Sequence, residues 1–143
     1  TRSGRIIYGG GGVTPDIYIP FNLKLNSATR KIMSHPNRLM FNWSTSFIKK
    51  DDNISNSFKD FQLNWQVGES LFNEFLAFAK KEIDGLELEK VYEDAKYLKI
   101  ILKSEIAGVK WGINQLWGVR VIADNQIIGA LKHFDKANSF ILN

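Results

Sequence analysis

The sequence predicts a mainly α fold: a helical domain of about four or five helices, preceded by a short extended β-type and glycine-rich segment. Two observations predict this fold class. Apolar residues recur at helical spacing in several stretches of residues 21–143, whereas residues 1–20 carry two short β-type runs on either side of four consecutive glycines. Hydrophobic residues make up 44% of the 143 residues and aromatic residues 13%, which is enough for one domain with a core of its own.

The first helix is expected after residue 34. Ser34 can cap its N-terminus, and Pro36 is tolerated in a first turn. Met40, Trp43 and Phe47 then follow at helical spacing. Trp43 is therefore expected in the core rather than on a surface that stacks against a ligand.

Three further helices are expected in the second half of the chain. Ser70 can cap a helix that ends at Asp84-Gly85. The longest helix is expected from about Glu87 to about Lys110. Asp124 is expected to cap a last helix that reaches Phe134.

Two stretches do not follow the helical pattern. Phe61, Leu63 and Trp65 alternate with polar residues, which predicts a short strand or an extended link. Residues 116–122 are apolar and partly β-branched, so the pattern leaves helix and strand open there.

The net charge of +4 is unevenly distributed. Residues 1–50 carry eight Lys and Arg and one acidic residue, and residues 51–143 carry eleven Lys and Arg and fourteen acidic residues. A basic half can bind nucleic acid or an anionic surface, but no basic run is dense and no nucleic-acid motif accompanies it. We therefore expect no nucleic-acid partner. The absence of cysteine excludes disulfides and thiolate chemistry, and no apolar run approaches the roughly 20 residues of a membrane span.

Few residues form a candidate catalytic, cofactor or metal site. The glycines Gly9 to Gly12 lead into another extended run instead of a helix, so we expect a close backbone approach rather than a phosphate loop. Ser104 and Lys103 are sequence neighbours within a predicted helix, where adjacent side chains point about 100° apart and do not face each other. The lysines are expected largely on solvated polar faces of helices. The sequence thus predicts no catalytic residue and no cofactor.

Metal binding is not expected either. His35 and His133 are far apart in sequence, and neither has further ligands at metal-binding spacing. The run Asp51-Asp52-Asn53 lacks the remaining ligands of a calcium loop.

Residues 3–16 resemble a particular protein family. Ser3-Gly4-Arg5, the glycines ending at Gly12 and Pro15-Asp16 are similar to the segment that closes the catalytic domain of carboxyl-terminal processing peptidases, the tail-specific Ser–Lys serine proteases, in their Bacteroidetes-type form. In that family a Ser-Gly-Arg strand leads through a glycine turn to Pro-Asp. Val13 stands where the family usually has Ile.

A second resemblance to the same family lies between residues 102 and 131. It departs from the family pattern at Gly108, where Arg is usual, and residues 21–66 match only loosely. The matching residues are Leu102, Lys103, Ile106, Ala107, Trp111, Gly112, Val119, Arg120, Val121, Asp124, Ala130 and Leu131.

The resemblance implies that residues 1–20 end a protease core and residues 21–143 form a non-catalytic C-terminal helical domain. The family's Ser nucleophile, its Lys base and a PDZ domain belong upstream, so no catalytic residue carries over and this chain alone is expected to be inactive. The resemblance implies a structural motif at the end of the protease core, formed by Ser3, Gly4, Arg5, Gly12, Pro15 and Asp16. Arg5 and Asp16 are expected to pair across the turn, on grounds of charge and proximity.

The resemblance further implies a periplasmic or cell-envelope location. The expected partners are the upstream core and PDZ domain, and pairing with another copy of the chain stays open as a role. The alternative hypothesis is a stand-alone helical module that binds a peptide or an anionic partner through its basic first third.

Overall fold

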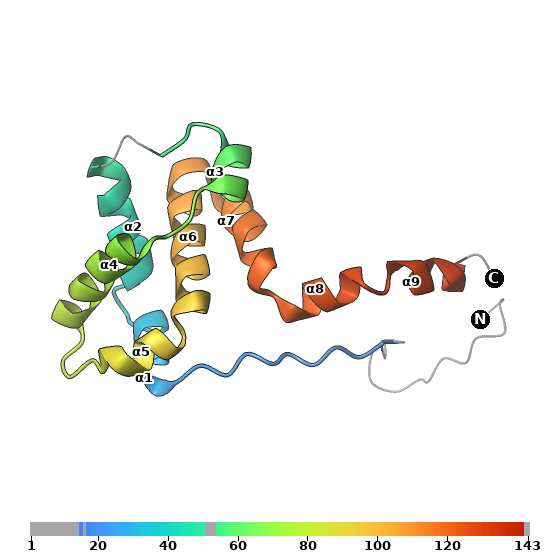
Figure 1. The fold of residues 1–143 in the computed structure, drawn as a ribbon, viewed down its shortest axis with the longest axis horizontal. Helices are drawn as coiled ribbons and strands as arrows, with labels where there is room; N and C mark the ends of the chain where they lie inside the picture. The colour runs from blue at the N-terminus through green and yellow to red at the C-terminus, as the bar shows by residue number, and fades with distance from the viewer. Residues whose placement is uncertain (1–14, 16, 51–53, 142–143) are drawn as a thin grey trace. The chain divides into compact units, whose positions relative to one another are not determined.

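A computed structural model of the chain describes residue 15, residues 17–50 and residues 54–141. These residues form nine α-helices and one 3-10 helix, and no strand occurs among them (Figure 1). The chain divides into two compact units. Leu23–Ala123 forms a helical bundle, and the described residues before Leu23 group with the described residues from Asp124 onward in a terminal unit. The predicted mainly α fold is confirmed, although the helices are shorter and more numerous than the four or five expected.

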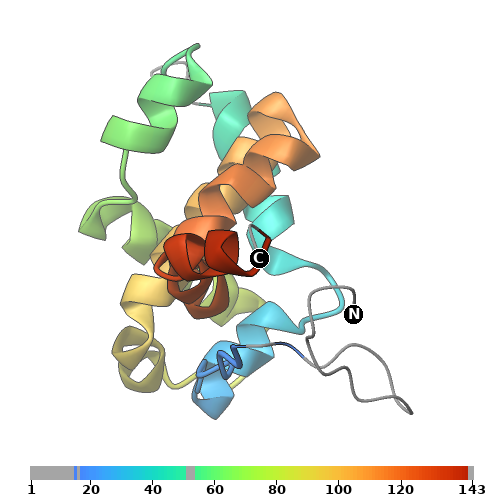
Figure 2. The same cartoon turned by 90° about the vertical axis from the view of Figure 1, so that its right-hand side faces the viewer.

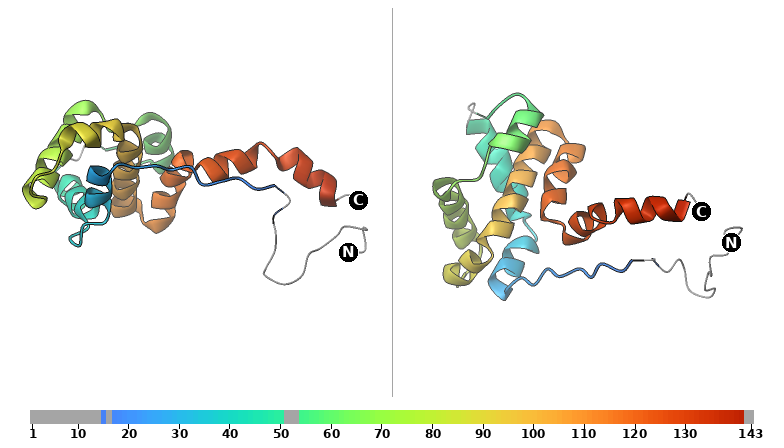
Figure 3. Two further views of the ribbon diagram at one scale, coloured as in Figure 1. Left: turned by 90° about the horizontal axis from the view of Figure 1, so that it is seen from below. Right: turned by 45° about the vertical axis from the view of Figure 1, so that its right-hand side comes forward.

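The bundle is built around α6, which contacts α2 on one side and α7 on another (Figures 1 and 3). α1 and α5 contact each other at one end of the bundle, and α3 lies against α7 near the turn between α6 and α7 (Figure 2). The helices of the bundle are α1 (Ser27–Met33), α2 (Leu39–Lys50), α3 (Phe58–Asn64), α4 (Glu69–Glu82), α5 (Leu88–Glu93), α6 (Ala95–Trp111) and α7 (Ile113–Arg120), followed by the 3-10 helix η1 (Val121–Ala123).

Aromatic side chains fill much of the bundle core. The Trp43 ring lies 5.7 Å from the Phe75 ring in an edge-on contact, and the Phe61 ring lies 4.9 Å from the Trp111 ring. Burial of such rings away from water is the main favourable contribution to folding. The predicted core position of Trp43 is confirmed. The largest fully buried apolar side chains are Phe61, Phe72, Phe75, Ile32, Leu39, Leu76, Leu98, Leu102, Ile106, Val91 and Val119.

Two predicted N-caps are wrong. Ser34 ends α1 instead of starting the next helix, because its backbone N–H and hydroxyl both donate to the carbonyl of Arg30. α1 itself was not predicted, and Asn26 caps it through a bond from the Thr29 N–H at 3.1 Å. α4 begins at Glu69, with Gly68 in the N-cap position, which is two residues earlier than a cap at Ser70 would place it.

The stretch expected to be a strand or link is the helix α3. Ser57 caps it by accepting from the Asp60 N–H. Phe61 is fully buried against Trp111, while Leu63 is exposed. The alternation of apolar and polar residues therefore does not reflect a strand. Trp65 lies just past the end of the helix, where its ring stacks on the Phe61 ring at 4.8 Å.

The long helix expected from residue 87 to 110 is two helices. Asp94 separates α5 from α6, with its backbone outside the helical region. Its carboxylate accepts a hydrogen bond from the Asn26 N–H at 3.0 Å, which ties the break to the start of α1. The spacing of apolar residues could not predict this break, because the contact joins residues far apart in sequence.

The end of α6 follows the sequence prediction. Gly112 has φ of +108°, a value that favours glycine, and it both ends α6 and precedes α7. Residues 116–122, for which helix and strand were open, belong to α7 and η1.

The terminal unit contains α8 (Asn125–Leu131), α9 (Phe134–Ile141) and the residues before Leu23. Asp124 caps α8 as predicted, by accepting from the N–H groups of Gln126 at 2.8 Å and Ile127 at 3.1 Å. The single helix expected to reach residue 134 instead ends at Leu131, and α9 starts at Phe134. Residues 18–20 form neither helix nor strand.

Candidate functional site

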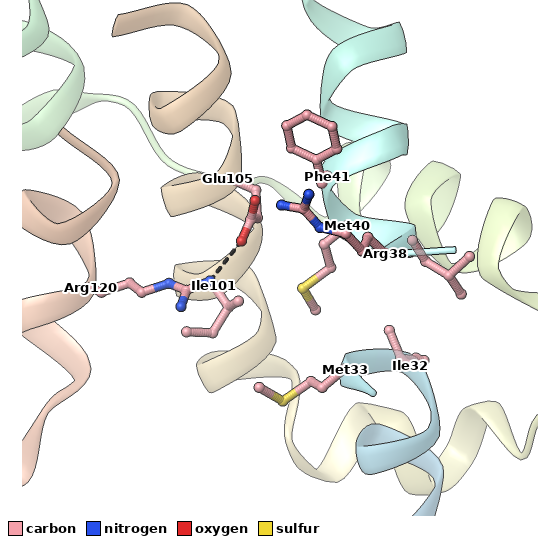
Figure 4. A pocket seen from close by; sticks show the side chains of 9 residues that line it. Ile32, Met33, Arg38, Met40, Phe41, Ile101, Glu105 and Arg120 are labelled. Carbon is pink, nitrogen blue, oxygen red and sulfur yellow. Dashed lines mark hydrogen bonds and ion pairs between the residues drawn. The ribbon is translucent and has the colours of Figure 1, made fainter. Parts of the chain in front are cut away.

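A small cavity in the bundle combines charged groups with apolar walls, and we call it the arginine pocket. Its volume is about 130 Å³ (Figure 4). It lies where the end of α1, the start of α2, the middle of α6 and the end of α7 meet. The lining residues are Ile32, Met33, Arg38, Leu39, Met40, Phe41, Ile101, Glu105 and Arg120.

The floor of the arginine pocket is apolar and the rim is accessible to solvent. Ile32, Met40 and Ile101 are buried, at 1%, 6% and 4% exposure. Met33 and Phe41 are exposed, at 41% and 37%. The side chains of Ile101, Met33 and Met40 approach the same space from three different helices (Figure 4). An apolar group that entered here would leave water and contact flexible methionines that adapt to its shape.

Arg120 is fixed by two partners on α6. Its Nη2 donates to Glu105 Oε1 at 2.6 Å, and its Nε donates to Ser104 Oγ at 3.0 Å. The side chains of Arg120 and Glu105 are only 30% and 13% exposed, so the pair is largely removed from solvent. A charge-assisted hydrogen bond of this kind is stronger than a neutral one and holds the guanidinium in one orientation.

Arg38 occupies an unusual backbone conformation at the rim. Its φ is +46°, and it is the one non-glycine residue with positive φ in the described part of the chain. L-residues other than Asn, Asp and Gly rarely adopt this conformation. The Arg38 N–H donates to the His35 carbonyl at 2.9 Å, which closes the turn that precedes α2.

The Arg38 guanidinium lies over the Phe41 ring, 4.4 Å from its centre. It forms no ion pair with any acidic residue that the structure describes. Figure 4 shows the guanidinium directed toward α6, on the side where Glu105 lies. The arginine pocket therefore holds two guanidinium groups and one carboxylate, and Arg38 forms no ion pair of its own among the described residues.

Lys103 and Ser104 do not form a catalytic pair. Lys103 Nζ donates to the Gln62 carbonyl at 2.9 Å, and Ser104 Oγ donates to the Ile101 carbonyl at 2.6 Å. The hydroxyl is thus held between Ile101 and Arg120, and the ammonium is held by α3. The geometry agrees with the expectation that these neighbours do not face each other.

The expectation that lysines lie on solvated faces is wrong for Lys103. Its residue exposure is 1%, and its ammonium lies 5.4 Å from the centre of the Phe61 ring. Burial lowers the pKa of the Lys103 ammonium, because removal from water disfavours the charged form.

Most of the predicted structural motif lies outside the described residues. Ser3, Gly4, Arg5, Gly12 and Asp16 fall there, as does the expected pairing of Arg5 with Asp16. The whole glycine run and the residues 51–53 also fall there.

Pro15 is described, and it lines an apolar groove in the terminal unit. It shares this groove with Ile17 and Ile19 from the N-terminal segment and with Ala130 and Phe134 from the C-terminal helices. Pro15 is exposed, and the side chains that line the groove are apolar apart from His133.

The two histidines lie in different units. His35 Nδ1 accepts from the Asn37 N–H at 3.3 Å within the turn before α2. Among the described residues, no three His, Asp or Glu side chains are grouped as metal ligands would be. None of the helices in that part of the chain combines the length and apolar character that a membrane span requires.

Sequence reasoning missed the arginine pocket. Glu105 and Arg120 are fifteen residues apart on two helices, and Arg38 comes from a third element. No local spacing connects them, because only the packing of α2 and α7 against α6 brings them together. The sequence gives only a weak signal for the pocket. Arg38 directly precedes the apolar residues that start α2, and a basic residue in such a position is common on protein surfaces.

Comparison with family models shows the family of the chain. The model of a family of unknown function (DUF8443) matches residues 37–112, slightly more than half of the chain. The chain belongs to this family. The DUF8443 match runs from the turn before α2 to the end of α6, and it includes Arg38 and Glu105 of the arginine pocket. No curated protein and no solved structure matches the chain.

Proposed function

We propose that this chain is the non-catalytic C-terminal part of a carboxyl-terminal processing serine peptidase, in which residues 1–20 end the protease core and the following helical domain has a structural, regulatory or substrate-presenting role. The observation that carries the proposal is the ordered motif of Ser3-Gly4-Arg5, Gly12 and Pro15-Asp16 followed by a helical domain. A periplasmic or envelope location and an upstream PDZ domain belong to the same proposal.

Contacts within the terminal unit support a common role for the two stretches that carry the resemblance. Gln126 Nε2 donates to the Ile19 carbonyl at 2.8 Å, and Asn125 Nδ2 donates to the Pro20 carbonyl at 2.7 Å. Pro15 from the first stretch and Ala130 from the second line the same apolar groove. The chain that leaves the proposed core is therefore held by the helix near the C-terminal end of the second match.

The departure from the family pattern at Gly108 has a packing reason in this chain. A Cβ atom on Gly108 would lie 2.9 Å from Leu116 Cδ1 and 3.2 Å from Leu116 Cβ. The close approach of α7 to α6 depends on the missing side chain. An arginine at this position would require a different packing of α7, so details of this helix pair do not carry over from the family.

The proposal assigns peptide hydrolysis to residues upstream of this chain. A Ser–Lys mechanism requires a serine within hydrogen-bond reach of a lysine whose pKa is lowered enough to accept a proton. The lysine with a lowered pKa is Lys103, and its ammonium donates to a carbonyl of α3 rather than to a serine. This contact supports a structural role for Lys103.

The first test is the coding sequence before Thr1. We expect it to continue in frame into a protease core with a serine nucleophile and a lysine base. A start codon within a few residues of Thr1 would contradict the proposal.

A second test compares peptide cleavage by the 143-residue chain and by the longer protein. We expect an unstructured peptide with an apolar C-terminus to be cleaved by the longer protein alone. The control is the Ser104→Ala variant of the chain. Cleavage by the chain that disappears in this variant would overturn the proposal.

A further inference from the structure

The arginine pocket has the features of a binding site for a small acid. Its volume of about 130 Å³ is well below the roughly 300–1,000 Å³ of sites for drug-sized ligands and cofactors. A nucleotide therefore does not fit, whereas a short chain of a few carbon atoms does. This inference concerns the bundle alone and is independent of the peptidase proposal.

The distribution of polarity fixes how such a ligand would lie. The buried floor of Ile32, Met40 and Ile101 offers no hydrogen-bond donor from its side chains, so it suits an apolar group. The rim carries Arg38, whose guanidinium presents a planar fork of N–H donors that matches a carboxylate. A ligand with one apolar end and one carboxylate end satisfies both regions.

Glu105 limits the charge of the ligand. Its carboxylate is held by Arg120, which leaves Arg38 as the guanidinium of the pocket without an acidic partner among the described residues. A second carboxylate next to Glu105 would be repelled by a like charge in a poorly solvated place. With two guanidinium groups and one carboxylate in its lining, the pocket suits a ligand with one carboxylate, and an acid with a carboxylate at each end is disfavoured.

The backbone conformation of Arg38 is unusual. Its φ of +46° is a conformation that L-residues rarely adopt, and its guanidinium is directed into the cavity (Figure 4). The Phe41 ring beneath the guanidinium, 4.4 Å from ring centre to cation, limits its orientations further.

We propose that the arginine pocket binds a monocarboxylate carried on a short apolar group, with the carboxylate on Arg38 at the rim and the apolar group on Ile101, Met40 and Ile32. Arg120, fixed by Glu105 and Ser104, forms the side wall. The carboxylate can come from a free short-chain acid or from the end of a peptide chain, and both share this chemistry.

The test uses the 143-residue chain and isovalerate as the probe, with two-dimensional NMR of the amide and methyl groups. We expect binding with a Kd of about millimolar strength, as is reasonable for a ligand of so few atoms. The methyl signals of Ile101 and Met40 should shift. Isovaleramide, which has the same shape without the charge, and succinate, which has two carboxylates, should shift them at least about tenfold more weakly.

Two variants separate the proposal from surface attraction. Arg38→Gln keeps the Cβ atom and the exposed position but removes the charge, and should weaken isovalerate binding about tenfold or more. Lys31→Gln removes a neighbouring exposed charge outside the pocket and should leave the affinity unchanged. Met33→Trp at the rim should block the cavity without altering the buried floor. This variant should therefore also weaken isovalerate binding, although Arg38 is intact.

N-acetyl-leucine distinguishes the two sources of the ligand. Tighter binding of N-acetyl-leucine than of isovalerate assigns the site to chain ends, and the reverse order assigns it to free acids. The proposal is overturned if isovaleramide shifts the same methyl signals as strongly as isovalerate, if Arg38→Gln binds isovalerate unchanged, or if neither acid shifts the pocket methyl signals. None of these outcomes depends on protease activity.

Discussion

The bundle and the terminal unit are both built from helices, but α4 and α6 of the bundle and α8 of the terminal unit bury their apolar residues to very different degrees. In the bundle, α4 and α6 place their apolar stripes in the core, and Phe72, Phe75 and Leu102 are fully buried. In the terminal unit, α8 has no buried residue, and Ile127 and Leu131 remain 40% and 60% exposed. α8 thus meets the sequence criteria for a helix without contributing a buried residue to a core.

The difference shows that different interactions hold the two regions. The α6 helix is stabilised by packing against α2 and α7. The seven residues of α8 are too few to be stable alone, and the helix instead has a side-chain cap from Asp124 and polar contacts from Asn125 and Gln126 to the carbonyls of Pro20 and Ile19. Loss of an apolar side chain should therefore matter in the bundle, and loss of a polar contact should matter locally in the terminal unit.

The largest effect is expected from the same substitution made in each region. Leu102→Ala in the core of the bundle should lower the free energy of unfolding by about 2–5 kcal/mol, because it removes buried methyl groups and leaves a cavity. Leu131→Ala in α8 should change it by less than about 0.5 kcal/mol, since that side chain is 60% exposed. Urea unfolding followed by circular dichroism measures both. Equal losses of unfolding free energy in the two variants would contradict the view that apolar burial stabilises the bundle but not α8.

A smaller effect is expected from removal of one helix cap in each region. Asn26→Ala removes the cap of α1 and should cost about 1 kcal/mol of global stability. Asp124→Ala removes the cap of α8 and should instead raise hydrogen exchange at the N–H groups of Gln126 and Ile127, with little change in global unfolding. A global loss from Asp124→Ala as large as that from Asn26→Ala would show that the terminal helices fold together with the bundle.

The smallest effect at neutral pH is expected for Lys103→Met. The substitution removes a buried charge but also the donor to the Gln62 carbonyl, so stability at pH 7 should change by less than about 1 kcal/mol. Lys96→Met at an exposed position of α6 is the matched control.

The pH dependence of this variant has a definite sign. Burial lowers the folded-state pKa of Lys103 below its ordinary value of 10.5. Between the folded and the unfolded pKa the unfolded chain binds more protons, so the contribution of Lys103 to stability should rise with pH through this window. The difference in unfolding free energy between wild type and Lys103→Met should therefore shift in favour of wild type as the pH rises toward 10.5. A difference that is constant with pH would indicate an ordinary pKa for Lys103.

Local patterns determined much of the helical structure of the chain. The stripe that includes Met40, Trp43 and Phe47 formed a helix, and Asp124 and Gly112 began and ended helices as their chemistry predicts, because caps and left-handed glycines act within one turn. The resemblance to peptidases also rests on the sequence alone, and it stays a prediction for the experiments above.

Tertiary packing decided the rest. Asp94 divides the expected long helix because its carboxylate accepts from Asn26, sixty-eight residues away. Lys103 is buried where α3 packs near α6, and the Gln62 carbonyl of α3 accepts a hydrogen bond from its ammonium. The arginine pocket exists because α2, α6 and α7 converge, which brings Arg38, Glu105 and Arg120 to one cavity. Periodicity reports only which face of a helix is apolar, and the partners that a polar side chain meets across such a face are fixed by contacts between elements far apart in sequence.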